Sequence, residues 1–427
     1  MDSLPDAILQ YILSHLSNAR DVASCNCVSH RFHHSTPFIH SLYFPRNAFD
    51  FDAASPASSS SSDTIINNMI AAAARLESLI VYSSFSAAAL KSWVSLTSTS
   101  LRRLELRMDS LSDKGNAAAA ATEAMSKLEC IDCVKGLEEL KLWGVLMTQF
   151  PNWTGFFGLR TLEIVGARLK DEAVSEAIKA CPNLRVLALL GCDGIRSVSI
   201  ELLQLEQCRL DFYGQGNAFL SLNCPMLHLL EVQGCSWIQV NPNHRLTNLT
   251  IANNGGRVYK VDFGKLNGLE FLSIRGIQWC WDAVSSILQC ASEVKHLVMK
   301  IEFTGDFDVL QSFPQVDLVD FFNTHSKLER FEIHGAMFAA LCQKYSLKSV
   351  DSRFTIPCLE EVVVTVRSPL NAEQKISTLE SLLRYGKKLK RLSIKILQMK
   401  NSHSSTDEFF EEVCKFRSVN AHIVRIE

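Results

Sequence analysis

The stretch Leu184-Arg185-Val186-Leu187-Ala188-Leu189 contains the spacing that decides the fold: an apolar residue, two others, a second apolar residue, one other, and a third apolar residue. The last two apolar positions alternate with the residue between them, so they point to one face of a short β-strand. The same spacing predicts 13 such strands, at Leu76-Leu79-Val81, Leu101-Leu104-Leu106, Leu137-Leu140-Leu142, Leu159-Leu162-Ile164, Leu184-Leu187-Leu189, Leu205-Cys208-Leu210, Leu227-Leu230-Val232, Leu246-Leu249-Ile251, Leu269-Leu272-Ile274, Val294-Leu297-Met299, Leu328-Phe331-Ile333, Leu359-Val362-Val364 and Leu389-Leu392-Ile394.

The distances between these strands indicate a repeat protein. Seven successive steps between Leu137 and Val294 take 19 to 25 residues each, close to the 20–29 residues of leucine-rich repeats. Six glycines follow strands by two positions, where the chain must turn: Gly144, Gly166, Gly191, Gly234, Gly276 and Gly335. We therefore expect an α/β fold, a right-handed solenoid shaped like a horseshoe, with parallel strands on its concave face and a helix outside each strand. Residues 171–178 exemplify such a helix, and Cys181-Pro182, Cys192, Cys224-Pro225 and Cys235 are typical of a cysteine-containing subtype.

The first 36 residues, MDSLPDAILQYILSHLSNARDVASCNCVSHRFHHST, predict a separate helical module. Leu4-Pro5 opens a first helix, because proline suits the first turn and restricts the residue before it. That helix carries two adjacent apolar stripes, formed by Ile8, Ile12 and Leu16 and by Leu9 and Leu13. After a turn, Asp21 is expected to cap a second helix. Two stripes on so short a helix exceed what the segment can cover alone, which favours docking on a partner.

These residues resemble an F-box. The matching positions are Leu4-Pro5, Ile8-Leu9, Ile12-Leu13, Leu16, Asp21-Val22 and Val28 to Phe32, with Phe32 where the family usually has tryptophan and Val22 where leucine is common. The resemblance implies a module that binds a Skp1-type adaptor in a cullin-RING ubiquitin ligase, the cullin being contacted only indirectly. It also implies a set of adaptor-binding residues: Leu4, Pro5, Ile8, Leu9, Ile12, Leu13, Leu16, Val22, Val28 and Phe32.

An F-box followed by leucine-rich repeats resembles the F-box/LRR proteins, plant members in particular, over nearly the whole chain. The resemblance implies a substrate receptor that holds a protein on its solenoid while other subunits perform ubiquitin transfer. The alternative is an interaction scaffold whose N-terminal hairpin only caps the solenoid. Removing residues 1–44 is expected to distinguish them, leaving a soluble solenoid in the first case and an aggregating one in the second. Ligand sensing is a third, weaker possibility, and no cofactor is expected.

Composition sets the domain limits and the environment. We expect a helical module at 1–44, a flexible serine-rich loop at 45–64 and the solenoid at 65–427, with residues 67–76 helical. A net charge of −2 without a dense basic block predicts no nucleic-acid or membrane partner. The sequence contains no run of 18 apolar residues, so we expect no membrane-spanning helix. The 14 cysteines are interpreted as buried free thiols of an intracellular protein, in the nucleus or the cytoplasm.

Residues suited to catalysis are scattered. Cys130 and Cys133 form one CxxC without a second pair at zinc-site spacing, and His30, His33 and His34 are interpreted as a polar helix end. We therefore expect neither enzyme activity nor a metal site.

Geometry suggests where a substrate would bind. Arg275, Lys300 and His334 are predicted on the concave face, where Arg209, Arg275 and Lys300 could converge on an anion. Four aromatic residues follow strand ends and are predicted on the rim: Tyr213, Trp237, Trp279 and Trp281. Aromatic and arginine anchors usually dominate interfaces. Each of the four could equally pack between adjacent repeats.

Overall fold

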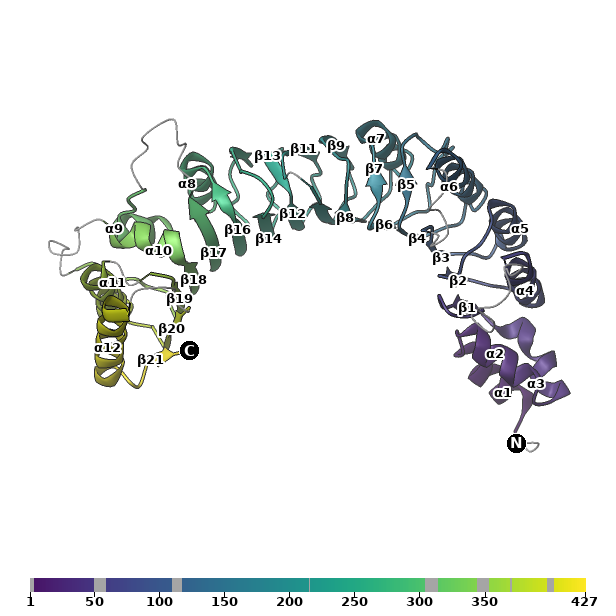
Figure 1. Ribbon diagram of the computed structural model, residues 1–427, viewed down its shortest axis with the longest axis horizontal. Coiled ribbons are helices and arrows are strands. Elements are labelled where there is room, and N and C mark those ends of the chain that lie inside the picture. Colours follow the sequence, from purple (N-terminus) through teal and green to yellow (C-terminus); the bar gives the residue numbers. More distant parts are fainter. Residues whose placement is uncertain are drawn as a thin grey trace. The chain divides into compact units, whose positions relative to one another are not determined.

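The computed structural model describes residues 4–49, 59–109, 117–214, 216–303, 314–343, 353–368, 371–397 and 403–427 (Figure 1). Its contacts divide the chain into two compact units, Met1–Tyr213 and Gly214–Glu427. Each unit consists of a parallel sheet with further helices and short strands on one side of it.

The first unit begins with the helical module. It comprises α1 (Asp6–Ser14), α2 (Ala19–Asn26), α3 (His30–His34) and the 3-10 helix η1 (Thr36–Phe38). Pro5 precedes α1 as predicted. The predicted cap of α2 is wrong, because Asn18 occupies that position and its Oδ1 accepts from the backbone N–H of Arg20 at 3.0 Å. Asp21 instead lies in the first turn, where its charge favours the helix dipole.

The main sheet of the first unit is parallel throughout. Its strands, in spatial order, are β1 (Ser41–Phe44), β2 (Ser78–Val81), β3 (Arg103–Arg107), β4 (Glu139–Trp143), β6 (Thr161–Val165), β8 (Val186–Cys192) and β10 (Gln207–Phe212). The middle apolar residue of each repeat pairs with that of the next, in the register Leu42, Leu79, Leu104, Leu140, Leu162, Leu187 and Cys208. All of these side chains are buried, so one continuous apolar row forms the core.

The second unit repeats this arrangement. Its main strands are β12 (Leu229–Gln233), β14 (Asn248–Asn253), β16 (Phe271–Trp279), β17 (His296–Phe303), β18 (Arg330–His334), β19 (Glu361–Val366), β20 (Arg391–Ile396) and β21 (Val424–Ile426). The buried register row is Leu230, Leu249, Leu272, Leu297, Phe331, Val362, Leu392 and Val424. Every predicted strand is therefore present, and the expected α/β fold with parallel strands is confirmed.

Two strands of the main sheet were missing from the prediction. β1 follows the same spacing, Ile39-Leu42-Phe44, but lies within the segment that we assigned to the helical module. β21 is short and carries a single fully buried residue, Val424. Both pair with predicted strands, β1 with β2 and β21 with β20. The sheet therefore begins inside residues 1–44.

The second layer of each unit contains helices and short strands. The helices are α4 (Ser59–Ala72), α5 (Ala87–Thr97), α6 (Ala117–Ile131) and α7 (Asp171–Lys179) in the first unit, and α8 (Trp281–Cys290), α9 (Leu318–Thr324), α10 (Gly335–Cys342), α11 (Ala372–Tyr385) and α12 (His403–Val419) in the second. The short strands are β5 (Leu146–Met147), β7 (Arg168–Leu169), β9 (Ser197–Glu201), β11 (Ala218–Asn223), β13 (Cys235–Val240) and β15 (Lys260–Asp262). Figure 1 shows this layer on one side of the main strands.

The expectation of a helix in every repeat is wrong, and repeat length explains where it fails. Steps of 25 residues or more between predicted strands contain a helix, as in the step from Leu159 to Leu184, which holds α7. The steps of 19 to 23 residues have a strand instead, as in the step from Leu227 to Leu246, which holds β13. A helix advances only 1.5 Å per residue against about 3.3 Å for a strand, so a short repeat can cross the layer only in extended form.

Residues 45–64 differ in part from the predicted flexible loop. α4 begins at Ser59, so residues 59–64 are helical, and the helix expected at 67–76 ends at Ala72. Residues 50–58, in the middle of the predicted loop, lie outside the described residues.

Candidate functional site

Helix α1 exposes an apolar stripe. Ile8, Tyr11 and Ile12 are 45%, 68% and 46% exposed, and their i, i+3, i+4 spacing places them on one face of the helix. Leu9 and Leu13 form the neighbouring stripe and are buried, at 4% and 1%. The helix therefore uses one apolar stripe for the core of its own module and leaves the other uncovered among the described residues. Such a surface is typical of a protein-binding site.

The predicted adaptor-binding residues divide by exposure. Ile8 and Ile12 are exposed, as are Pro5 and Val28, and the half-exposed residues are Leu4, Leu16 and Phe32. The side chains of Leu9, Leu13 and Val22 are buried within the unit. Their burial disfavours direct contact with an adaptor, and their role in adaptor binding stays a prediction. Apolar periodicity identifies both stripes but not which of them faces inward. For the same reason Tyr11 and Phe38, which are exposed, were not among the predicted residues.

Arg31 connects α3 with the start of α1. Its guanidinium lies 2.5 Å from Asp6 Oδ1 and also donates to the backbone carbonyl of Leu4 at 2.5 Å. Arg31 is thus the link between α3 and the start of α1, and it holds the exposed end of α1 in place.

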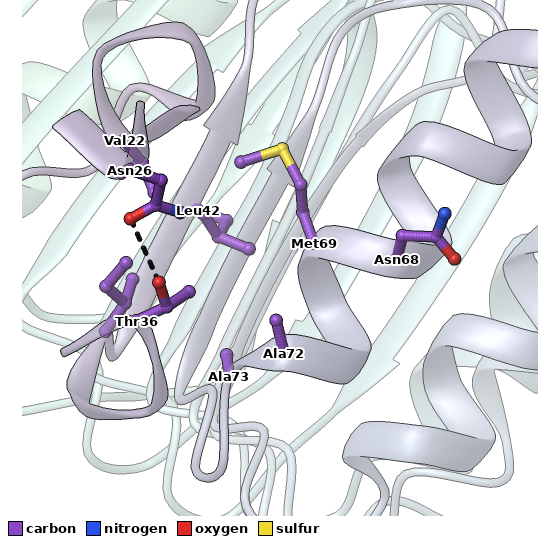
Figure 2. Close-up of a pocket in the computed structure, with 9 residues that line it drawn as sticks. Val22, Asn26, Thr36, Leu42, Asn68, Met69, Ala72 and Ala73 are labelled. Carbon is purple, nitrogen blue, oxygen red and sulfur yellow. Dashed lines mark hydrogen bonds between the residues drawn. The ribbon is translucent and has the colours of Figure 1, made fainter. Parts of the chain in front are cut away.

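A cavity of about 150 Å³ lies between the module and α4 (Figure 2). Its lining is mostly apolar and comes from α2, η1, β1 and α4: Val22, Asn26, Thr36, Ile39, Leu42, Asn68, Met69, Ala72 and Ala73. The Thr36 hydroxyl donates to Asn26 Oδ1 at 3.0 Å on one wall. The module therefore packs on the first repeat through loosely fitted side chains rather than being separated from it.

On the face of the first unit's sheet away from its helices, three side chains form a fixed cluster. Tyr82 Oη donates to Glu105 Oε1 at 2.5 Å, and Trp143 Nε1 donates to the same oxygen at 2.9 Å. Glu105 is buried, which would raise its pKa, but these hydrogen bonds and the charges of Lys141 and Arg103 outweigh burial and lower it. Burial and the bond to Glu105 raise the pKa of Tyr82. Sequence reasoning missed Tyr82 and Glu105, which the β2 and β3 registers bring together.

The corresponding face of the second unit brings together three of the predicted substrate-binding residues. Arg275 and Lys300 are register partners on β16 and β17. Lys300 Nζ lies 2.7 Å from Glu332 Oε1, and His334 Nε2 lies 3.4 Å from the same atom. Burial lowers the pKa of His334 despite that carboxylate. An acidic side chain, Glu332, therefore lies against Lys300, one of the three bases predicted to converge on an anion. Arg209, another of the three, belongs to β10 of the first unit.

The predicted aromatic residues do not share a site. Tyr213 is 76% exposed, whereas Trp279 is 1% exposed and donates from Nε1 to the backbone carbonyl of Arg275 at 3.1 Å. Trp279 follows the alternative left open by the sequence and packs inside the repeats, because β16 continues past a register shift between Gly276 and Trp279. Trp237 lies in β13 rather than on a loop, stacked on Tyr259 at 4.9 Å. Trp281 starts α8 and contacts Phe303.

Among the described residues, no group of three or more His, Cys, Asp or Glu side chains could hold a metal ion. All 14 cysteines are free thiols. Burial raises the pKa of Cys181 to about 12 and that of Cys192 to about 11, so both remain protonated at neutral pH. The CxxC pair is partly exposed at the end of α6, and burial raises the pKa of Cys130, which disfavours its thiolate. No described helix is long and apolar enough to cross a membrane.

Comparison with known proteins gives two matches. The F-box-like family matches residues 1–43, the segment that contains α1, α2, α3 and η1. Over its full length, the chain is 57% identical to F-box protein At1g10780 from Arabidopsis thaliana, with 427 residues aligned and 100% of both chains covered. The resemblance found in the first 36 residues therefore extends over the full length of a relative that is named as an F-box protein.

Proposed function

This chain belongs to the plant F-box proteins, and from that premise we propose a role for each of its two surfaces. F-box proteins serve in general as non-catalytic substrate receptors of SCF-type ubiquitin ligases. The module binds a Skp1-type adaptor through the exposed stripe of α1, and the adaptor links the chain to the cullin. The open faces of the repeat sheets bind a protein substrate. The repeats are leucine-rich repeats of the cysteine-containing subtype.

The exposed stripe of α1 is the observation that carries the adaptor proposal. Ile8, Tyr11 and Ile12 would each lose their exposed apolar area to a partner, and burying one such side chain fully is worth about 1.5–3 kcal/mol. Pro5 and Val28 are exposed as well and extend the surface beyond the helix. Leu9 and Leu13 support the stripe from below, so their contribution to adaptor binding is to hold α1 in place.

The open sheet faces support the substrate proposal. Their polar side chains are held by neighbours rather than freely solvated, as Glu105 is by Tyr82 and Trp143, and as Glu332 is by Lys300. Preordered side chains lose less conformational entropy when a partner binds.

The adaptor proposal is tested with the full-length chain and a purified Skp1-type adaptor. The variant is Ile8→Asp with Ile12→Asp, and the matched control is Leu96→Asp, an equally exposed apolar position on α5. We expect the double variant to lose adaptor affinity by about 100-fold or more, since two carboxylates would have to be desolvated in the interface. Thermal unfolding should be unchanged in both variants, because all three side chains are exposed.

Undiminished adaptor binding by the double variant would contradict the placement on α1. A well-folded wild type that does not bind any Skp1-type adaptor would contradict the ligase role itself. The chain would then be a repeat scaffold, the alternative that the sequence left open.

A further inference from the structure

Positively charged side chains dominate one part of the second unit. On strands β16 to β21, the residues that alternate with the buried apolar row form an open face that we call the cationic face. We include Arg367 and Glu427, which directly follow β19 and β21. The bases of the face are then Arg275, Lys300, Arg330, Arg367, Arg391, Lys395 and Arg425, and its acids are Glu302, Glu332, Glu361 and Glu427. The bases outnumber the acids although the whole chain has a net charge of −2.

Two of the acids of this face, Glu361 and Glu427, are each shared by two bases. Glu361 lies 2.6 Å from Arg330 and 3.7 Å from Arg391. Glu427 in turn lies 3.2 Å from Arg391 and 3.5 Å from Lys395. Each carboxylate thus bridges two bases, which leaves positive charge uncompensated along the row.

The bases also lie nearer to the solvent than the acids that they contact. Side-chain exposure is 58% for Arg330 against 22% for Glu361, and 52% for Arg367 against 34% for Glu302. Lys300 is likewise more exposed than Glu332. A molecule that approaches the face therefore meets ammonium and guanidinium groups before it meets carboxylates.

A buried polar atom lies within the same face. Thr365 pairs with Lys395 on β20 and with His334 on β18, and its hydroxyl is buried without a hydrogen-bond partner in the described structure. An unsatisfied hydroxyl costs stability unless a ligand or rearranged side chain reaches it. The Thr365 hydroxyl on β19 could therefore form a hydrogen bond with a bound ligand.

The open face of the first unit lacks this charge imbalance. Its strand positions carry Arg103, Arg107, Lys141 and Arg209 against Glu105, Glu139, Glu163 and Asp211. The cation excess is therefore a property of β16 to β21 and not of the repeats in general.

We propose that the cationic face binds an acidic segment, rich in aspartate and glutamate, of the protein substrate. The inference rests on the proposed substrate-binding role of the sheet faces and specifies the chemistry that they select. Complementary charge speeds encounter and suppresses wrong partners, and its effect falls as salt rises.

The test measures binding of the full-length chain to a fluorescent peptide in which glutamate alternates with serine, beside a peptide with glutamine in place of glutamate. The variant is Arg330→Gln, Arg391→Gln and Lys395→Gln. The matched control removes the same charge through Lys295→Gln, Lys327→Gln and Lys390→Gln, three exposed lysines of the same unit that each pair with one glutamate off the strands. A fourth protein carries the single change Arg275→Gln, which should not disturb folding. Arg275 is exposed, and the change removes one hydrogen bond, to Ser273 Oγ on the same strand.

We expect the wild type to prefer the glutamate peptide by about tenfold or more at low salt. The strand variant should lose that preference, Arg275→Gln should reduce it, and the control should keep it. Three results would overturn the proposal. The wild type could bind both peptides equally, or the strand variant and the control could lose the same affinity for the glutamate peptide. The third is tighter binding of single-stranded DNA than of the glutamate peptide. Adaptor binding is measured on the same proteins: if it is retained while the peptide preference is absent, the inference fails and the ligase role stands.

Discussion

His325 follows α9 with an imidazole ring that is 2% exposed. Its Nδ1 lies 2.9 Å from the backbone oxygen of Phe321, and its Nε2 lies 3.1 Å from that of Leu288. Burial lowers the pKa of His325, and the two carbonyl contacts offset this only in part. A neutral ring donates to only one of the two carbonyls, whereas a protonated ring could donate to both, yet burial still favours the neutral form.

The sign of the resulting pH dependence follows from linkage. Between the lowered pKa of folded His325 and the ordinary value of about 6.5 in the unfolded chain, the unfolded chain binds a proton that the folded chain does not. The free energy of unfolding should therefore fall as pH drops through about 6.5. We expect this fall to be smaller in His325→Gln, as measured by chemical denaturation at about pH 7.5 and about pH 5.5. His296 and His334, whose pKa values burial also lowers, keep part of the effect in the variant. An equal fall in wild type and variant would contradict the assignment.

Single residues show how far the sequence can be interpreted. The register row of leucines was predictable because the same spacing recurs, and each instance supports the others. The burial of Trp279 was not predictable. A tryptophan after a strand has the same sequence context whether the chain turns outward or continues through a bulge. His325 gave no signal either, since its two partners are backbone carbonyls that no side-chain pattern encodes.

At the scale of elements, the strand ends depend on glycine to different degrees. Gly276 has φ +141°, and a Cβ there would press against the backbone oxygen of Asn253 on the adjacent strand. Gly166 has φ +61°, and a Cβ there would meet nothing within 4 Å. Only the left-handed backbone itself opposes a side chain at Gly166, at a cost of about 1–2 kcal/mol.

We therefore expect Gly276→Ala to destabilise the chain clearly more than Gly166→Ala. Gly166→Ala should cost about 1–2 kcal/mol. Gly276→Ala adds a clash between two backbones, which neither strand can relieve by rotating a side chain. Urea unfolding of the two variants beside the wild type measures the difference. Equal losses would mean that strands β14 and β16 can separate without cost, contrary to their continuous pairing.

Whether a repeat carries a helix was partly encoded in its length. Spacing between strands was visible in the sequence, but we assumed a helix in every repeat, although steps of 19 to 23 residues leave too few residues for one. The start of α4 was hidden for a different reason. Ser59 to Ser62 have the composition of a linker, yet Ser62 is buried, so tertiary contacts override local preference there.

At the scale of the whole molecule, the boundary between module and repeats is less sharp than composition suggested. β1 belongs to the main sheet of the first unit, and Ile39, Leu42 and Phe44 are buried in its core. Val22 of α2 and Met69 of α4 also line the same cavity. The helical module and the first repeats therefore share part of one apolar core.

Removal of residues 1–44 should consequently destabilise the first unit, whether or not the chain binds an adaptor. The deletion takes away β1, exposes the edge of β2 together with the apolar side chains that β1 covers, and leaves an aggregation-prone strand. A chain that begins at residue 36 keeps η1 and β1 and is the matched control. We expect lower soluble yield and earlier thermal unfolding for the shorter chain than for the control, measured by size-exclusion chromatography and a thermal melt.

If the two truncated chains behave alike, β1 is dispensable and the module ends where composition placed it. If the shorter chain alone fails, truncation cannot separate a ligase receptor from a scaffold, and the exposed positions Ile8 and Ile12 must decide between them.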